Sequence, residues 1–217
     1  MSVNKRRVFV FGDSHVGAFA LYANDLNIPM IQGGRALGAY LFPFIPCHFP
    51  GATAHNLISL KSKSDSDTLW SLNLSAVSKE RDLIMLWFGE IDCRYHIKDV
   101  EMIDQTIENY MEKIQELEDE GYTFVVMSNP PANKDGGTTP IGDRPKIYAK
   151  FFEKLKEECE KRNYKMLDMY TFALGEDGYM KRELMRDDTH FKPDAIYKYV
   201  VERLMEDFYI SFRFYGG

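Results

Sequence analysis

Arg7–Ser14 has the sequence Arg-Val-Phe-Val-Phe-Gly-Asp-Ser and sets the expectation for the rest of the chain. The apolar run Val8–Phe11 predicts a buried first strand, and Gly12 permits a tight turn directly after it. A helical stretch is expected to follow, from Ser14 to about Asn24. A strand that leads straight into a helix is the repeating unit of a parallel α/β sheet.

Strands and helices continue to alternate along the chain. Asp82–Phe88 is continuously apolar after its first residue, as is typical of a central parallel strand. Apolar side chains recur at helical spacing over Val100–Glu120, and Gly121 predicts the end of that helix. Further strands are predicted at 28–31, 44–49, 122–128 and 164–169, and further helices after Gly51, at 146–162 and at 192–208. We therefore expect an α/β three-layer sandwich with a central parallel sheet of about five strands.

Composition and charge exclude several classes of protein. The chain has 217 residues and shows no linker, so a single domain over 1–217 is expected. The net charge of −6 argues against nucleic-acid binding. Val8–Phe11 is too short for a signal peptide or a membrane span, which predicts no membrane association and a cytoplasmic location. The three cysteines have unrelated spacings, so we expect reduced thiols and no metal site.

Polar residues gather where the predicted strands end. The first strand is followed by Gly12–His15, the strand at 82–88 by Gly89–Arg94, the next by Ser128–Pro131, and the last by Asp187–Phe191. Open parallel sheets place their sites beyond the carboxyl ends of the strands. These four segments are therefore expected to share one edge of the sheet.

Three residues in these segments predict nucleophilic catalysis. The hydroxyl of Ser14 becomes a nucleophile only when a base removes its proton, and that base needs a third group to fix its tautomer. His190 and Asp187, three residues apart on one turn, supply both groups. Each motif alone is weak, because a Ser after Gly-Asp is more often a helix cap and Asp-x-x-His is common.

The motifs gain weight because their order resembles that of a known family. Gly12–Ser14, 49–54 and 177–191 resemble the first, second and final blocks of the SGNH (GDSL-like) hydrolase superfamily. The resemblance implies a flavodoxin-like architecture, a shallow site, and neither a metal nor an organic cofactor. It also implies an oxyanion hole formed by the N–H groups of Ser14 and Gly51.

The third block departs from the family pattern of Gly-x-Asn-Asp. Here the sequence is Gly-Glu-Ile-Asp-Cys-Arg over 89–94, which resembles a divergent branch, and Ile91 cannot donate the hydrogen bond that the family's Asn supplies. Losing one oxyanion donor typically costs on the order of 10²–10³ in rate. Arg94 and His96 are the nearest candidates to replace it. Asp92 is expected to brace the site by hydrogen bonds.

Other polar residues at the same edge have two interpretations each. Glu90, Arg94 and Asn129 are candidates for substrate binding, but Glu90 could cap the following loop and Arg94 could pair with a nearby acid. His15 and His55 are expected on the surface or on a helix face rather than as alternative bases.

Three functions are compatible with these residues. The first is a serine esterase that hydrolyses a small acyl ester, with O-acetylated carbohydrate as the leading substrate class on the strength of the resemblance alone. The second is an acyltransferase with the same triad. The third is a non-catalytic carbohydrate-binding or assembly relative, which the missing Asn favours and the intact Ser14, Asp187 and His190 disfavour. The oligomeric state is not indicated.

Overall fold

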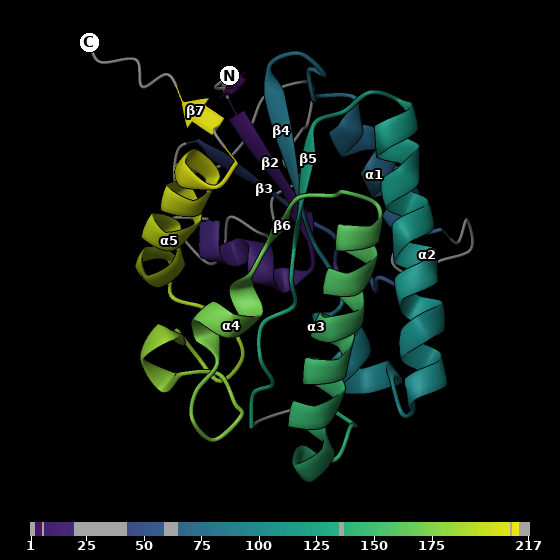
Figure 1. Ribbon diagram of the computed structural model, residues 1–217, viewed down its shortest axis with the longest axis vertical. Helices are drawn as coiled ribbons and strands as arrows, with labels where there is room; N and C mark the ends of the chain where they lie inside the picture. Colours follow the sequence, from purple (N-terminus) through teal and green to yellow (C-terminus); the bar gives the residue numbers. More distant parts are fainter. Residues whose placement is uncertain are drawn as a thin grey trace.

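A five-stranded parallel sheet forms the centre of the protein (Figure 1). The computed structural model describes residues 3–5, 7–19, 43–58, 65–134, 137–208 and 210–212. The strand order is β3-β2-β4-β5-β6, and the strands are β2 (Arg7–Gly12), β3 (Phe44–His48), β4 (Asp82–Trp87), β5 (Phe124–Met127) and β6 (Met166–Leu167). The sheet confirms the predicted α/β class. Its order reverses between β2 and β4, and such a reversal opens a crevice at the carboxyl ends of the two strands.

Helices cover both faces of this sheet, which completes the three layers (Figure 1). One face carries α1 (Ser66–Leu74), α2 (Val100–Asp119) and α3 (Arg144–Lys161), and the other carries η1 (Ser14–Phe19), α4 (Met169–Ala173) and α5 (Pro193–Glu206).

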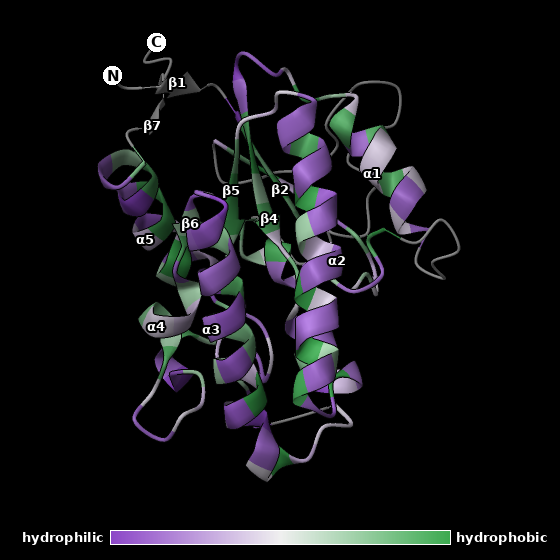
Figure 2. Cartoon of the chain, turned by 45° about the vertical axis from the view of Figure 1, so that its right-hand side comes forward, coloured by the Kyte–Doolittle hydropathy of each residue, from purple (hydrophilic) through white to green (hydrophobic). Residues whose placement is uncertain are grey.

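Apolar side chains alternate between the two faces of the sheet along each strand, so both faces need to be covered by helices. In β2, Phe9 and Phe11 join the core on the side of α1–α3, whereas Val8 and Val10 join the core on the side of α5. Successive side chains of a strand point to opposite faces. Figure 2 shows the result, with apolar strands in the middle and hydrophilic outer surfaces on α2 and α3.

Short elements complete the description. They are η3 (Asp92–His96), η4 (Ile141–Asp143), η5 (Arg182–Leu184), and a separate two-stranded parallel sheet of β1 (Val3–Lys5) and β7 (Ile210–Phe212). Among the described residues, none of the helices combines the length and apolar character needed to cross a bilayer.

The structure corrects one predicted helix. Residues 51–58 form turns instead of the helix expected after Gly51, and the backbone N–H groups of Ala54 and His55 bind the Asp92 carboxylate. Among the described residues after Gly51, the first helix begins at Ser66. The strand predicted at 28–31 lies outside the described residues.

Candidate active site

Ser14 lies where β2 ends and η1 begins, at the crevice between β2 and β4. Its side chain is half-buried. The turn before it requires Gly12, because a Cβ at this position would meet the carbonyl oxygen of Trp87 on β4. The close approach of the two strand ends therefore fixes where the serine hydroxyl emerges.

His190 lies against this hydroxyl although 176 positions separate the two residues. His190 Nε2 is 2.8 Å from Ser14 Oγ, and His190 Nδ1 lies 3.0 and 3.1 Å from the two carboxylate oxygens of Asp187. Asp187 Oδ1 also accepts hydrogen bonds from the backbone N–H groups of Thr189 and His190. The three predicted side chains thus form a continuous chain of hydroxyl, imidazole and carboxylate, which is the geometry needed to activate a serine.

The charges around His190 favour its neutral form. Burial lowers the pKa of His190, the neighbouring His15 lowers it further, and the carboxylate of Asp187 only partly opposes these effects. Burial alone would raise the pKa of Asp187, but its hydrogen bonds from the backbone N–H groups of His190 and Thr189 outweigh that effect and lower it. Near neutral pH, the pair is therefore an uncharged base beside an ionised carboxylate.

Asp92 ties the second and third blocks together. Its carboxylate accepts hydrogen bonds from the N–H groups of Ala54 at 2.8 Å and His55 at 3.1 Å, which confirms its expected bracing role. The N–H of Phe49 donates to the Gly12 carbonyl at 2.8 Å. Gly51 lies between these anchors in an exposed turn with φ of +68°, a conformation that favours glycine.

Glu90 and Arg94 make polar contacts with neighbouring side chains of the protein. The Tyr148 hydroxyl donates to Glu90 Oε1 at 3.0 Å, and Arg94 Nε lies 3.1 Å from the same oxygen without an aligned hydrogen bond. Arg94 Nη1 donates to Thr189 Oγ1 at 3.2 Å. The structure therefore places Arg94 beneath the turn that carries His190, where it contacts Thr189 and Glu90.

Asn129, a predicted substrate-binding residue, and His96, a candidate oxyanion donor, differ in burial. Asn129 is fully buried, and its amide nitrogen donates to the carbonyl groups of Pro130 and Tyr148. His96 is exposed, with its ring centroid 6.4 Å from that of Tyr95. Neither residue belongs to the hydrogen-bonded chain through Ser14.

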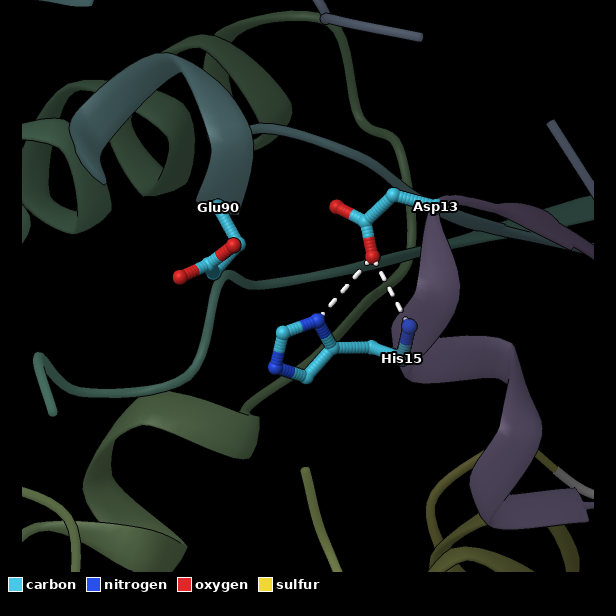
Figure 3. Close-up of side chains that lie close together, drawn as sticks. All are labelled: Asp13, His15 and Glu90. Carbon is cyan, nitrogen blue, oxygen red and sulfur yellow. Dashed lines mark hydrogen bonds and ion pairs between the residues drawn. The ribbon is translucent and has the colours of Figure 1, made fainter. Parts of the chain in front are cut away.

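His15 was missed as part of this site. His15 lies on η1, in agreement with the helix-face alternative, but it is not at the surface, because it is only 2% exposed. Its Nδ1 lies 3.0 Å from Asp13 Oδ1 (Figure 3), and its ring centroid is 5.3 Å from that of His190. The contacts that bury it come from Trp87 and from the turn at Thr189. The only local signal was the acidic residue two positions earlier.

Asp13, His15 and Glu90 are also the described residues whose nitrogen and oxygen atoms are spaced for a metal ion, within 4.8 Å of one another. A cation is already present here, because the Arg94 guanidinium lies beside Glu90. We therefore interpret the cluster as a network of charge pairs. The three cysteines are buried, and burial raises the pKa of each thiol, so they are held protonated.

Two cavities lie near the site's supporting loops. One, of about 660 Å³, is lined by residues that extend from Asn133 and Lys134 to Arg182, Glu183 and Met185, two residues before Asp187. The other, of about 700 Å³, lies between the start of α2 and the start of α3.

Comparison with known proteins places this geometry in context. No protein-family model matches the chain, and none of the curated proteins does. Among solved structures, a GDSL-like lipase from Bacteroides thetaiotaomicron has a TM-score of 0.63 at 16% identity, covering 94% of this chain and 88% of that one. A lipase/acylhydrolase from Enterococcus faecalis has a TM-score of 0.58 at 17% identity, covering 92% and 95%. The chain has the SGNH-hydrolase fold.

A third structure of this fold is a member of the lipolytic protein G-D-S-L family from Veillonella parvula, with a TM-score of 0.56 at 15% identity, covering 93% of this chain and 97% of that one. The SGNH-hydrolase fold therefore extends over nearly the whole chain. At these identities the likeness concerns architecture, and the chemistry depends on the residues at the crevice.

Proposed function

We propose that the protein is a serine ester hydrolase in which Ser14 attacks the acyl carbonyl. The observation that carries the proposal is the 2.8 Å contact between His190 Nε2 and Ser14 Oγ, with Asp187 on the other ring nitrogen. His190 takes the proton of Ser14 during attack and returns it to the leaving alcohol. During the attack, the N–H groups of Ser14 and Gly51 stabilise the oxyanion of the tetrahedral intermediate. Loss of the alcohol leaves an acyl-enzyme, and a water molecule activated by His190 hydrolyses it to release the acid and free Ser14.

The contacts of Arg94, Glu90 and Asn129 favour positioning roles for these residues. Arg94 donates to Thr189, and Glu90 lies beside Arg94, so we assign both to positioning the turn that carries His190. Asn129 binds the backbone beneath the site, at Pro130 and Tyr148. His96 is exposed and free to meet a substrate, and it is the remaining candidate for the donor that Ile91 cannot supply.

Solvent access favours hydrolysis over acyl transfer. The His190 side chain is 24% exposed and that of Asp187 is 46% exposed, so water reaches the base that must activate it in the second half of the reaction. An acyltransferase needs the opposite, because water competes with the acceptor hydroxyl for the acyl-enzyme.

The cavity of about 660 Å³, whose lining reaches Met185 but includes none of the triad residues, favours a polar substrate, with O-acetylated carbohydrate as the leading class. Its lining carries charges of both signs, among them Lys134, Lys181, Asp177 and Glu183, together with the ring of Tyr179. Polar groups around an aromatic ring suit a neutral, hydroxyl-rich ligand better than a long acyl chain.

The decisive experiment compares the wild type with Ser14→Ala on p-nitrophenyl acetate and with a fluorophosphonate probe. The wild type is expected to turn over the ester and to be labelled, and Ser14→Ala to do neither. Ser71→Ala removes an exposed serine on α1 and is the matched control, expected to behave as the wild type. A wild type that neither turns over ester nor labels above Ser14→Ala would refute the proposal.

Product analysis separates hydrolysis from transfer. Incubation with an acetylated oligosaccharide and a free sugar acceptor is expected to release acetate without acetylating the acceptor. Acceptor acetylation that depends on Ser14 would instead assign the triad to an acyltransferase.

A further inference from the structure

Both ring nitrogens of His15 face oxygen atoms that accept hydrogen bonds, and Figure 3 shows the contact with Asp13. Nδ1 lies 3.0 Å from Asp13 Oδ1, and Nε2 lies 3.2 Å from the backbone carbonyl oxygen of Thr189. A neutral imidazole carries only one N–H, so it can donate to one of these oxygens but not to both. A carbonyl cannot donate in return, and Asp13 Oδ1 already accepts the backbone N–H of His15 at 2.9 Å.

We propose that His15 is a buried imidazolium that holds the turn between Asp187 and His190 in place and keeps a positive charge beside His190. It is a positioning residue, because its contacts are to Asp13 and to the Thr189 carbonyl rather than to the reacting atoms. The part of this proposal that concerns catalysis rests on the proposed esterase function.

The charges that surround His15 balance when it is protonated and Glu90 is ionised; burial raises the pKa of Glu90, and the charge of His15 opposes that effect. Two carboxylates face it, Asp13 from its own turn and Glu90 from the segment after β4, and one cation, Arg94, faces it from η3. One oxygen of Glu90, Oε2, is buried and has no hydrogen-bond partner among the described residues. The positive charge of a protonated His15 therefore offsets the negative charge of the second buried carboxylate. Burying that carboxylate without a counter-charge would destabilise the fold.

Neighbouring charges outweigh the burial of His15. Burial alone would lower the pKa of His15, but the charge and hydrogen bond of Asp13 and the charge of Glu90 raise it, against a smaller opposing effect from Arg94. The remaining ring neighbours of His15 are Trp87 and Phe191, which are uncharged, and His190, whose own pKa is lowered.

Two cations hold the catalytic turn from beneath. His15 binds the carbonyl oxygen of Thr189, and Arg94 donates to its hydroxyl. Thr189 stands directly between Asp187 and His190 in sequence. The ring of His15, 5.3 Å from that of His190, therefore both fixes the turn and makes protonation of His190 less favourable. The result is a catalytic base that remains neutral at lower pH than an isolated histidine.

The protonation state can be measured directly by ¹⁵N NMR on the wild-type protein labelled at histidine, with the His15 signals assigned by their loss in His15→Gln. Both ring nitrogens of His15 are expected to carry protons at the usual histidine pKa of about 6.5, and one is expected to lose its proton only at higher pH. A titration near the usual histidine pKa, or one unprotonated ring nitrogen at that pH, would overturn the proposal. So would a shift of these signals on adding Zn²⁺, since a bound metal would then replace the proton.

The catalytic consequence is tested by the pH dependence of kcat/KM. In His15→Gln the acid limb is expected to move to higher pH, because His190 loses a neighbouring positive charge. His55→Gln is the matched control: His55 bonds Thr106 at 3.2 Å, and its acid limb is expected to stay where the wild type has it. A lower rate in His15→Gln with an unmoved acid limb would overturn the electrostatic role and leave only packing.

The proposed esterase function and the proposed charge of His15 can be refuted independently of each other. If the wild type has no esterase activity, the proposed function fails while the NMR measurement still decides the charge of His15. If His15→Gln does not fold, the wild-type titration again gives the answer, with the His15 signals assigned by elimination from His48→Gln, His55→Gln, His96→Gln and His190→Gln.

Discussion

The candidate active site contains two histidine–carboxylate pairs with nearly the same contact and opposite properties. In each pair Nδ1 lies 3.0 Å from a carboxylate oxygen, Asp187 for His190 and Asp13 for His15. Yet the pKa of His190 is lowered, chiefly by burial and by His15, whereas the pKa of His15 is raised despite its burial, by Asp13 and Glu90. A carboxylate partner alone therefore does not decide whether a histidine is a base or a fixed cation. The other neighbours decide it.

The largest expected difference between the pairs is in activity. Asp187→Asn is expected to lower kcat by roughly 10⁴, because the amide cannot hold the tautomer of His190 that accepts the Ser14 proton. The free energy of unfolding should change by less than about 1 kcal/mol, because the Asp187–His190 pair is partly exposed. Ester hydrolysis and urea denaturation measure the two quantities on the same samples. An active Asp187→Asn would remove the distinction drawn between the pairs.

The buried pair is expected to show its effect in stability. Asp13→Asn leaves a buried cation without its counter-charge, which destabilises a protein by roughly 3 kcal/mol, and both Asp13 and His15 are almost completely buried. Urea denaturation measures the loss. The double variant Asp13→Asn/His15→Gln is the control, because it removes both charges and should recover part of the stability. An Asp13→Asn protein as stable as the wild type would show that His15 carries no charge.

The pairs should also respond to pH in opposite directions. The folded pKa of His15 lies above 6.5, so its contribution is complete below pH 6.5 and is lost as pH rises through the folded pKa. The folded pKa of His190 lies below 6.5, so the unfolded chain gains the proton more readily, and stability falls as pH drops below 6.5.

Single variants separate these contributions. In His190→Gln the free energy of unfolding is expected to fall as pH rises through the region of the usual histidine pKa and above it, because His15 remains, and in His15→Gln this fall is expected to be absent. Denaturant titrations at a series of pH values provide the measurement. Equal slopes in the two variants would contradict the assigned charges.

The smallest expected effect concerns the thiols, which lie outside both pairs. Cys93, beside Asp92, is buried, and burial raises its pKa, with the charges of Asp92 and Glu90 adding to the effect. Its reaction with a disulfide reagent in the folded protein is expected to be slow and to accelerate on unfolding in urea. A fast reaction in the native state would indicate that the site opens more than the structure shows.

Much of this architecture could be predicted from local sequence. β2, β4 and α2 were predicted within one residue of their observed ends, because continuous apolar runs and helical spacing depend only on neighbours in the chain. The helix expected after Gly51 failed because Asp92, nearly 40 positions away, binds the N–H groups of that segment. Such a partner leaves no mark on the local pattern.

The residues of the candidate site likewise divide into those that local sequence predicts and those that it does not. Ser14, Asp187 and His190 could be proposed from ordered motifs, and the structure brings all three together. The burial of His15 could not be predicted, because Thr189 and Glu90, which enclose it, come from distant parts of the chain. The order of motifs along the chain predicts the proposed triad, whereas residues such as His15 that contact the triad can be identified only from the folded structure.

The separation of Ser14 from His190 also has a consequence for synthesis. A ribosome that has made the first four strands of the sheet has produced the nucleophile without its base, and truncation anywhere before residue 190 leaves the hydroxyl inert. Under the proposed mechanism, turnover begins only when the final turn docks beside η1. Colour from a chromogenic ester would then report, in a cell-free translation mixture, the moment at which the nascent polypeptide completes its fold.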